Sequence, residues 1–303
     1  MGKNLATIRK VIVRRLTIRR PVQFMGTGLL SGKPIQVHLL PAKAGEGIVF
    51  NERLKASFPY ARVIDHRTCL VHGKERIDMV EHFLAACYGC GITDLKVQVD
   101  GQEMPFGDGS ALPFVRIIKR AGQRPALSVA ERKSLGAIHK LPLLRIRSPV
   151  LVTQGRSFII ALPTLHQLRK AEDPLRVHCI LELSGLGKQF FSFSGSRMDF
   201  EENVAPARTF GKVSSAVRSQ LTAGVRTLGF SISSQHGWLF PKRWRFNNEP
   251  CRHKVLDLLG DISLLSFPIK GEIFAYKPGH KLNLLMVKRL NQICLERSQK
   301  EAR

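Results

Sequence analysis

Two short segments of the 303-residue chain carry residue types that could hold a metal ion. The first is Glu81-His82, in a stretch whose apolar residues recur at helical spacing. The second contains His253 and Asp257, which are four residues apart and would lie on one helix face, about one turn from each other. An imidazole and a carboxylate at that spacing can bind the same divalent ion.

Two further residues could complete a reactive site. Asp261 extends the face that carries His253 and Asp257, and His280 follows a predicted strand in Lys277-Pro278-Gly279-His280. A histidine on such a loop can act as an acid or a base.

Taken together, His82, His253 and Asp257 would be metal ligands, Glu81 a base and His280 an acid. Metal-assisted amide hydrolysis requires this set, because the metal activates water, a carboxylate takes its proton and an acid protonates the leaving amine.

Each segment also has an ordinary structural interpretation. Glu81-His82 alone fits a partly solvated helix surface, and an isolated His-x3-Asp spacing is most often a simple pair of neighbours on a helix. His280 could equally face water at the start of a helix. Spacing alone therefore leaves open whether these segments meet in space.

The elements that must position these residues alternate between strands and helices. Helical spacing predicts helices over 77–88, 110–121, 212–222, 252–266 and 280–300. Apolar runs bounded by turn residues predict strands over 35–39, 47–50, 60–72, 95–99, 143–153, 157–163, 176–183, 189–193 and 272–276. This order predicts an α+β protein.

Length and composition favour two domains. At roughly 150 residues per domain, the chain is long enough for an N-terminal domain over 1–124 and a C-terminal domain over 143–303. A basic segment over 125–142 is the expected linker. Apolar residues make up 44% of the chain and charged residues 23%, which excludes a disordered, collagenous or coiled-coil protein.

Charge is the unusual property of this chain. Lys and Arg number 48 against 23 Asp and Glu, a net charge of +25. Nucleic acid, an anionic membrane surface and a phosphorylated substrate all suit this charge, and so does a generally basic proteome. Because six scattered cysteines come with no export signal, we expect no disulfide framework and a cytoplasmic location.

Longer motifs surround the candidate residues in both halves of the chain. The first half contains Val80-Glu81-His82-Phe83-Leu84-Ala85-Ala86, Asp100-Gly101, Asp108-Gly109-Ser110-Ala111 and Pro113-Phe114. The second contains Ala207-Arg208-Thr209-Phe210-Gly211, the stretch 246–265 and Ala275-Tyr276-Lys277-Pro278-Gly279-His280. In this order, across roughly residues 17–295, the motifs resemble the UDP-3-O-acyl-N-acetylglucosamine deacetylases.

The resemblance implies a role for each matching position. His82, His253 and Asp257 match the metal ligands and Glu81 matches the general base. His280 matches the general acid, with Asp261 against it to stabilise its charged form. Thr209 matches the hydroxyl that helps hold the developing oxyanion. The positions that match substrate contacts are Phe210, Lys254 and Lys277.

The resemblance also implies a fold, a cofactor and partners. Each of the two α+β domains would layer a sheet on helices, with the active site between them and an acyl-chain insert near 212–232. Zn²⁺ is the expected cofactor, although two histidines and an aspartate also suit Fe²⁺. The expected substrate is an acylated UDP-sugar, deacetylated in the committed step of lipid A biosynthesis. A monomer is expected. Separately from the resemblance, the clusters of basic residues suggest peripheral contact with an anionic inner-membrane surface.

Several positions depart from the family pattern. Leu30 stands where the family has a histidine, Asp78-Met79-Val80 replaces Ser-Thr-Val, and the segment 229–246 is altered and short. The sequence therefore leaves open the alternative that the protein is a paralogue that deacetylates another N-acetylated sugar. The remaining alternative is a non-enzymatic basic protein that binds nucleic acid, which the low aromatic content of 7% and the lack of a nucleic-acid motif disfavour.

Overall fold

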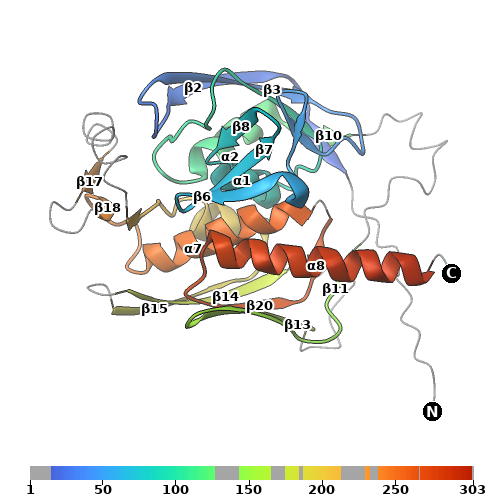
Figure 1. Cartoon of the computed structure of the whole chain (residues 1–303). Helices are drawn as coiled ribbons and strands as arrows, with labels where there is room; N and C mark the ends of the chain where they lie inside the picture. Colours follow the sequence, from blue (N-terminus) through green and yellow to red (C-terminus); the bar gives the residue numbers. More distant parts are fainter. Residues whose placement is uncertain are drawn as a thin grey trace, which may run out of the picture.

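The computed structural model describes residues 15–126, 143–164, 175–183, 187–212, 229–232, 238–265 and 267–301. These residues form two α+β halves, each with a sheet packed on helices, so the predicted fold class is confirmed. In Figure 1 the N-terminal half lies above the C-terminal half, with helices of both halves between the outer sheets. Among the described helices, none is long and apolar enough to cross a membrane.

The main sheet of the N-terminal half has the strand order β2-β3-β9-β4-β5. Its strand pairs are antiparallel except β4 with β9, which is parallel. The strands are β2 (Val22–Thr27), β3 (Pro34–Pro41), β4 (Ile48–Phe50), β5 (Leu54–Lys55) and β9 (Leu95–Val99). In β9 the apolar residues face the core and Lys96 and Gln98 face solvent, because alternate side chains point to opposite faces.

A second sheet of this half corrects one prediction from the sequence. Its strands are β6 (Ala61–Ile64), β7 (Arg67–His72) and β8 (Glu75–Asp78), so residues 75–78 are a strand and not the start of a helix. Cross-strand pairing decides this: Leu70 pairs with Ile77, and both are buried. The predicted helix begins later, as α1 (Glu81–Cys90), and α2 (Leu112–Ala121) packs beside it.

The C-terminal half is built on a sheet of order β12-β13-β20-β14-β15. Two long helices, α7 (Glu249–Ile262) and α8 (His280–Glu301), lie against one face of this sheet (Figure 1). The strands are β12 (Val150–Gln154), β13 (Ser157–Leu162), β14 (Arg176–Leu183), β15 (Gly187–Phe193) and β20 (Glu272–Tyr276). The strand predicted over 272–276 is therefore confirmed.

Shorter elements complete the described residues. Strand β1 (Leu16–Ile18) pairs with β10 (Gln123–Pro125), and β11 (Leu144–Arg145) pairs with β19 (Ile269–Lys270). A small sheet contains β16 (Gly211–Lys212), β18 (Trp238–Pro241) and β17 (Phe230–Ile232), in that order. The other short helices are η1 (Phe58–Tyr60), α4 (Arg197–Asp199), η2 (Phe200–Val204) and η3 (Ser263–Leu265).

Two predicted features fall largely outside the described residues. The expected linker over 125–142 is described only at its first two residues, and the expected insert near 212–232 only at residue 212 and over 229–232. The helix predicted over 212–222 is described only at residue 212, which belongs to β16.

Helices α1 and α7 join the two halves by a close approach at one glycine. A Cβ atom at Gly260 of α7 would lie only 2.2 Å from the backbone oxygen of Glu81 in α1. Glycine is therefore required there for the two backbones to meet. This contact sets the first turn of α1 directly against the middle and end of α7.

Candidate active site

Three metal-ligating side chains meet where α1 crosses α7. His82 comes from α1, whereas His253 and Asp257 lie one turn apart on α7. One potential ligand atom from each of the three residues lies within 4.8 Å of the others. The structure thus places together residues that are 175 positions apart in the sequence.

The donor set fits a metal ion. Oδ1 of Asp257 is buried and has no hydrogen-bond partner among the described atoms, yet it lies 3.3 Å from Nε2 of His253 and 3.7 Å from Nε2 of His82. An unpartnered buried carboxylate oxygen is costly unless a cation satisfies it. Nδ1 of His253 donates to the backbone oxygen of Ala207 at 3.1 Å, which leaves Nε2 free to act as a ligand.

Burial and neighbouring charges tune these groups for metal binding. Burial lowers the pKa of His253 to about 3, so its imidazole is neutral, as a ligand must be. The pKa of Asp257 lies well below its ordinary value: burial opposes this shift, but His253, Lys254 and His280 outweigh it. Asp257 therefore keeps a full negative charge for a cation.

Glu81 begins α1 and sits beside the three candidate ligands. Its side chain is buried, and its Oε2 accepts a long hydrogen bond of 3.3 Å from the backbone N–H of Thr68. Burial raises the pKa of Glu81, whereas His280 and His82 counteract the rise. A carboxylate whose pKa is raised toward neutrality is suited to accept a proton.

His280 lies across from Glu81, as the first residue of α8. Its Nε2 is 3.9 Å from Oε1 of Glu81 and 3.7 Å from Oδ2 of Asp257, and its Nδ1 donates to Oδ2 of Asp261 at 2.8 Å. Burial opposes the charged form, but Asp261 and Asp257 outweigh it and raise the pKa of His280 to about 9. At neutral pH His280 therefore carries a proton that it can give away.

Two residues of this network escaped the sequence analysis. The hydroxyl of Thr68 donates to Oδ1 of Asp261 at 2.6 Å and lies 3.1 Å from Nδ1 of His280. Asn283 donates to Oδ2 of Asp261 at 2.8 Å. Asn283 could have been found, since it follows His280 by three residues on one helix, but Thr68 comes from strand β7 and has no local signal.

The candidate residues line a cavity of about 560 Å³. Both halves line it: the N-terminal half contributes Leu30, Met79 and Glu81, among others, and the C-terminal half contributes His253 and Thr209. The expectation of an active site between the halves therefore holds. Leu30, which departs from the family pattern, is part of the wall.

The residues expected to contact substrate also line this cavity. They are Phe210, Lys254 and Lys277. The Phe210 ring stacks on Trp238 and meets the imidazole of His253 edge-on, with ring centroids 6.0 Å apart. Lys254 lies 5.2 Å above the same ring, and its ammonium donates to Oδ2 of Asp257 at 2.8 Å.

Four residues that line the cavity have unusual backbone conformations, and they are Asp65, His66, Met79 and Lys277. Met79 and Lys277 have φ angles of 59° and 50°, in the left-handed region that side chains rarely adopt. Met79 lies two residues before Glu81, and Lys277 lies three residues before His280. Such conformations gather at functional sites, where surrounding structure holds them.

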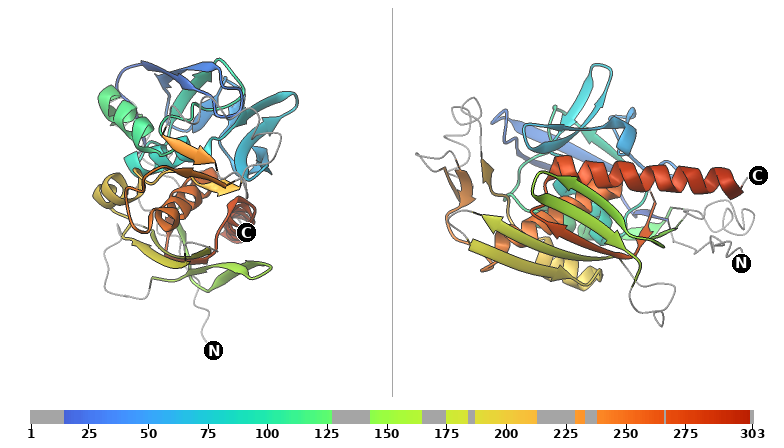
Figure 2. Two further views of the ribbon diagram at one scale, coloured as in Figure 1. Left: turned by 90° about the vertical axis from the view of Figure 1, so that its left-hand side faces the viewer. Right: turned by 60° about the horizontal axis from the view of Figure 1, so that its bottom comes forward.

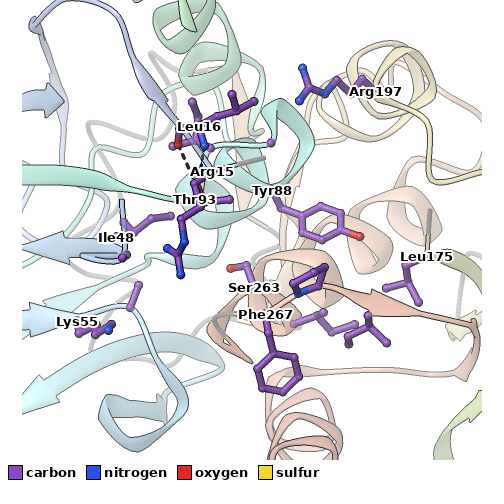
Figure 3. A pocket seen from close by; sticks show the side chains of 18 residues that line it. Arg15, Leu16, Ile48, Lys55, Tyr88, Thr93, Leu175, Arg197, Ser263 and Phe267 are labelled. Carbon is purple, nitrogen blue, oxygen red and sulfur yellow. Dashed lines mark hydrogen bonds between the residues drawn. The ribbon is translucent and has the colours of Figure 1, made fainter. Parts of the chain in front are cut away.

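A second cavity of about 580 Å³ contains none of the candidate residues. It lies at the other ends of α1 and α7, at Tyr88 and Ser263. Figure 3 shows Arg15 and Lys55 on one side of this cavity and Tyr88 on the other. The two cavities have similar volumes, so the candidate active site is identified by the residues that line it and not by its size.

Comparison with known proteins agrees with the geometry. The model of the family UDP-3-O-acyl N-acetylglycosamine deacetylase, LpxC, matches residues 15–292. Curated UDP-3-O-acyl-N-acetylglucosamine deacetylases are similar over most of the chain. The one from Syntrophotalea carbinolica is 32% identical over 92% of this chain and 88% of its own length. Those from Geotalea uraniireducens and Campylobacter jejuni are 34% and 32% identical, over 88% and 91% of this chain and 85% and 91% of theirs. The chain belongs to the UDP-3-O-acyl N-acetylglycosamine deacetylase family.

Proposed function

We propose that the protein is a metal-dependent hydrolase that removes the acetyl group from UDP-3-O-acyl-N-acetylglucosamine, releasing acetate and a free amine. This is the committed step of lipid A biosynthesis. The observation that carries the proposal is the meeting of His82, His253 and Asp257 around one unpartnered carboxylate oxygen, between Glu81 and His280. The curated relatives are named for the same substrate.

His82, His253 and Asp257 would hold the metal, with Zn²⁺ favoured and Fe²⁺ also suited to this donor set. When bound, such an ion lowers the pKa of water and polarises the amide carbonyl. The protein supplies the remaining chemistry through groups that accept, donate and orient.

Glu81 and His280 would carry out the two proton transfers of the reaction. Glu81 accepts a proton from the attacking water as the carbon–oxygen bond forms, and its raised pKa suits this step. Protonated His280 then donates to the sugar nitrogen as the carbon–nitrogen bond breaks, which converts a poor leaving group into a neutral amine. Thr209 lines the same cavity, where its hydroxyl would stabilise the oxyanion.

The cavity wall suits a substrate with a charged nucleotide and an apolar chain. Lys254 and Lys277 supply positive charge for a diphosphate, while Leu29, Phe210 and Leu239 supply apolar surface. Leu30 lines the cavity and departs from the family pattern. It therefore favours one second candidate function, which is deacetylation of a different N-acetylated sugar.

Acetate release from the acylated UDP-sugar tests the proposal. Purified protein loaded with one equivalent of Zn²⁺ should turn over, and His253→Ala should lose both bound metal and turnover. His178→Ala is the matched control, since that histidine lies on the opposite side of the C-terminal sheet, outside the cavity. Turnover that survives in His253→Ala would contradict the proposal. Bound metal with no turnover would favour the altered-substrate alternative.

A further inference from the structure

The sheet of the C-terminal half has an unusual outer face. Residues of β14 that point inward, such as Val177 and Cys179, are fully buried against the helices. Sheets with one solvated face normally carry polar residues there. On this sheet seven outward positions carry large apolar or aromatic side chains; they are Leu151, Phe158, Ile160, Ile180, Phe190, Phe274 and Tyr276. The same face also carries the polar residues Thr153, Arg176, His178, Glu182, Lys188, Ser192 and Glu272.

The strand register joins the seven apolar or aromatic residues, which we term the outer apolar patch, into two neighbouring rows. In one row Leu151 pairs with Ile160, which pairs with Phe274. In the other, four residues pair across four adjacent strands, in the order Phe158, Tyr276, Ile180, Phe190. The rings of Phe158 and Tyr276 stack at 5.7 Å. The patch is thus continuous from β12 to β15.

The patch is open to solvent. Leu151 and Phe190 are each 57% exposed and Phe158 is 39% exposed. In Figure 1 the sheet is the lowest layer, with α7 and α8 above it, and in the right-hand view of Figure 2 its strands lie in front of the described helices. Large contiguous apolar patches of this kind mark sites of association.

Positive charge borders the patch. Arg156 and Lys188 are exposed at the ends of outer strands, and Arg176 is partly exposed at the start of β14. The acidic residues of this face are Glu182, whose carboxylate accepts a hydrogen bond from Tyr276, and the buried Glu272. A second copy of the chain is a poor partner, because a twofold contact would set these cations against themselves.

The patch and the catalytic cavity lie on opposite faces of the same strands. Ser157 precedes Phe158, Leu181 follows Ile180 and Lys277 follows Tyr276, and all three line that cavity. Neighbouring side chains of a strand alternate between faces, so substitutions in the patch leave the cavity wall unchanged.

We infer that the outer apolar patch docks on an anionic lipid bilayer, with its aromatic and aliphatic side chains among the headgroups and its bordering cations on lipid phosphates. Apolar surface and basic residues act together in such interfacial binding. The benefit rests on the proposed function, because docking would hold the enzyme near a bilayer that could contain its acylated substrate.

Vesicle flotation tests this inference with the full chain. The protein should float with vesicles of phosphatidylcholine and phosphatidylglycerol, and much less with phosphatidylcholine alone or at high salt. The double variant Leu151→Ser/Phe190→Ser should weaken binding about tenfold or more, from the lost apolar burial. Met25→Ser is the control, because Met25 is 73% exposed on β2 of the other half.

The charge contribution has its own pair of variants. Arg156→Glu/Lys188→Glu should weaken flotation on anionic vesicles, whereas Lys33→Glu, which changes an exposed lysine of the N-terminal half, should not. Unchanged flotation of either double variant would overturn the inference. So would a dimer of the native chain that the Leu151→Ser/Phe190→Ser variant dissociates, since the patch would then be an interface between copies.

Activity separates this inference from the proposed function. None of the four changed residues lines the catalytic cavity, so both double variants should release acetate from a soluble short-chain substrate at the native rate. A protein that floats but has no activity would refute the proposed function alone. A protein that is active but does not float would refute the docking alone.

Discussion

Nδ1 of His280 lies 2.8 Å from Oδ2 of Asp261, and this contact joins the first residue of α8 to the last turn of α7. Asp261 is fully buried, and hydrogen bonds from Thr68 and Asn283 hold its two carboxylate oxygens. The geometry makes Asp261 a fixed negative charge behind the proposed acid. It therefore acts on the reaction through His280.

Removing the imidazole should have a large effect on the chemical step. We expect His280→Ala to lower kcat by about 10²–10⁴-fold, the usual contribution of a positioned general acid. KM and metal content should change little, because His280 is outside the group of candidate ligands. Steady-state kinetics and metal analysis of the same preparation measure both. A near-native kcat would remove His280 from the mechanism.

Thr68 should act as a positioning residue. Thr68→Val keeps the side-chain shape but leaves Oδ1 of Asp261 without its 2.6 Å donor, so we expect kcat to fall about tenfold with KM unchanged. Thr68→Ser restores a hydroxyl and should recover most of kcat. A native kcat in Thr68→Val would show that the hydrogen bond has no role in positioning.

Asp257 should determine metal content. Asp257→Asn removes the charge of the one carboxylate among the three candidate ligands. It should lower the bound metal per chain well below one equivalent, with loss of activity. Asp65→Asn is the control, because Asp65 is an exposed aspartate that lines the same cavity. Elemental analysis after dialysis gives the readout. Full metal retention in Asp257→Asn would place the ion elsewhere.

The close packing of α1 on α7 should depend on the absence of a side chain at Gly260. A methyl group there would meet the backbone of Glu81 at 2.2 Å, so Gly260→Ala should lower the free energy of unfolding by about 1–3 kcal/mol. Gly101→Ala is the matched control, since its new methyl would make ordinary contacts of 3.7 Å and longer with Ile35. Urea unfolding compares the two variants. Equal stabilities would contradict the close approach.

The pair Asp108–Arg245 should make stability depend on pH in the acid range. Burial raises the pKa of Asp108, but hydrogen bonds from Ser110 and Arg245, the latter at 2.7 Å, outweigh it and keep the pKa below its ordinary 3.8. Since the unfolded chain takes up this proton first as pH falls, the stabilisation is complete well above pH 3.8 and is lost below it. Asp108→Asn should therefore be less stable than the native protein at pH 7. The difference should shrink in unfolding curves measured toward pH 3.

Residue spacing predicted the parts of the site that depend on a single element. His253 and Asp257 share a helix face because 3.6 residues make a turn, and β9 and β20 follow from alternation and from flanking turn residues. Helix periodicity failed at Ile77, where pairing with Leu70 made residues 75–78 a strand. Cross-strand pairing is a tertiary fact that local periodicity does not contain.

Which of these groups meet depends on how the helices and strands pack. His82 reaches His253 because α1 crosses α7 at Gly260, and Thr68 reaches Asp261 across 193 residues of sequence. The raised pKa of His280 and the lowered pKa of His253 arise from burial and from charges that the fold brings near. Such contacts depend on the packing of whole elements, so residue spacing could name the candidate ligands but could not assemble the site.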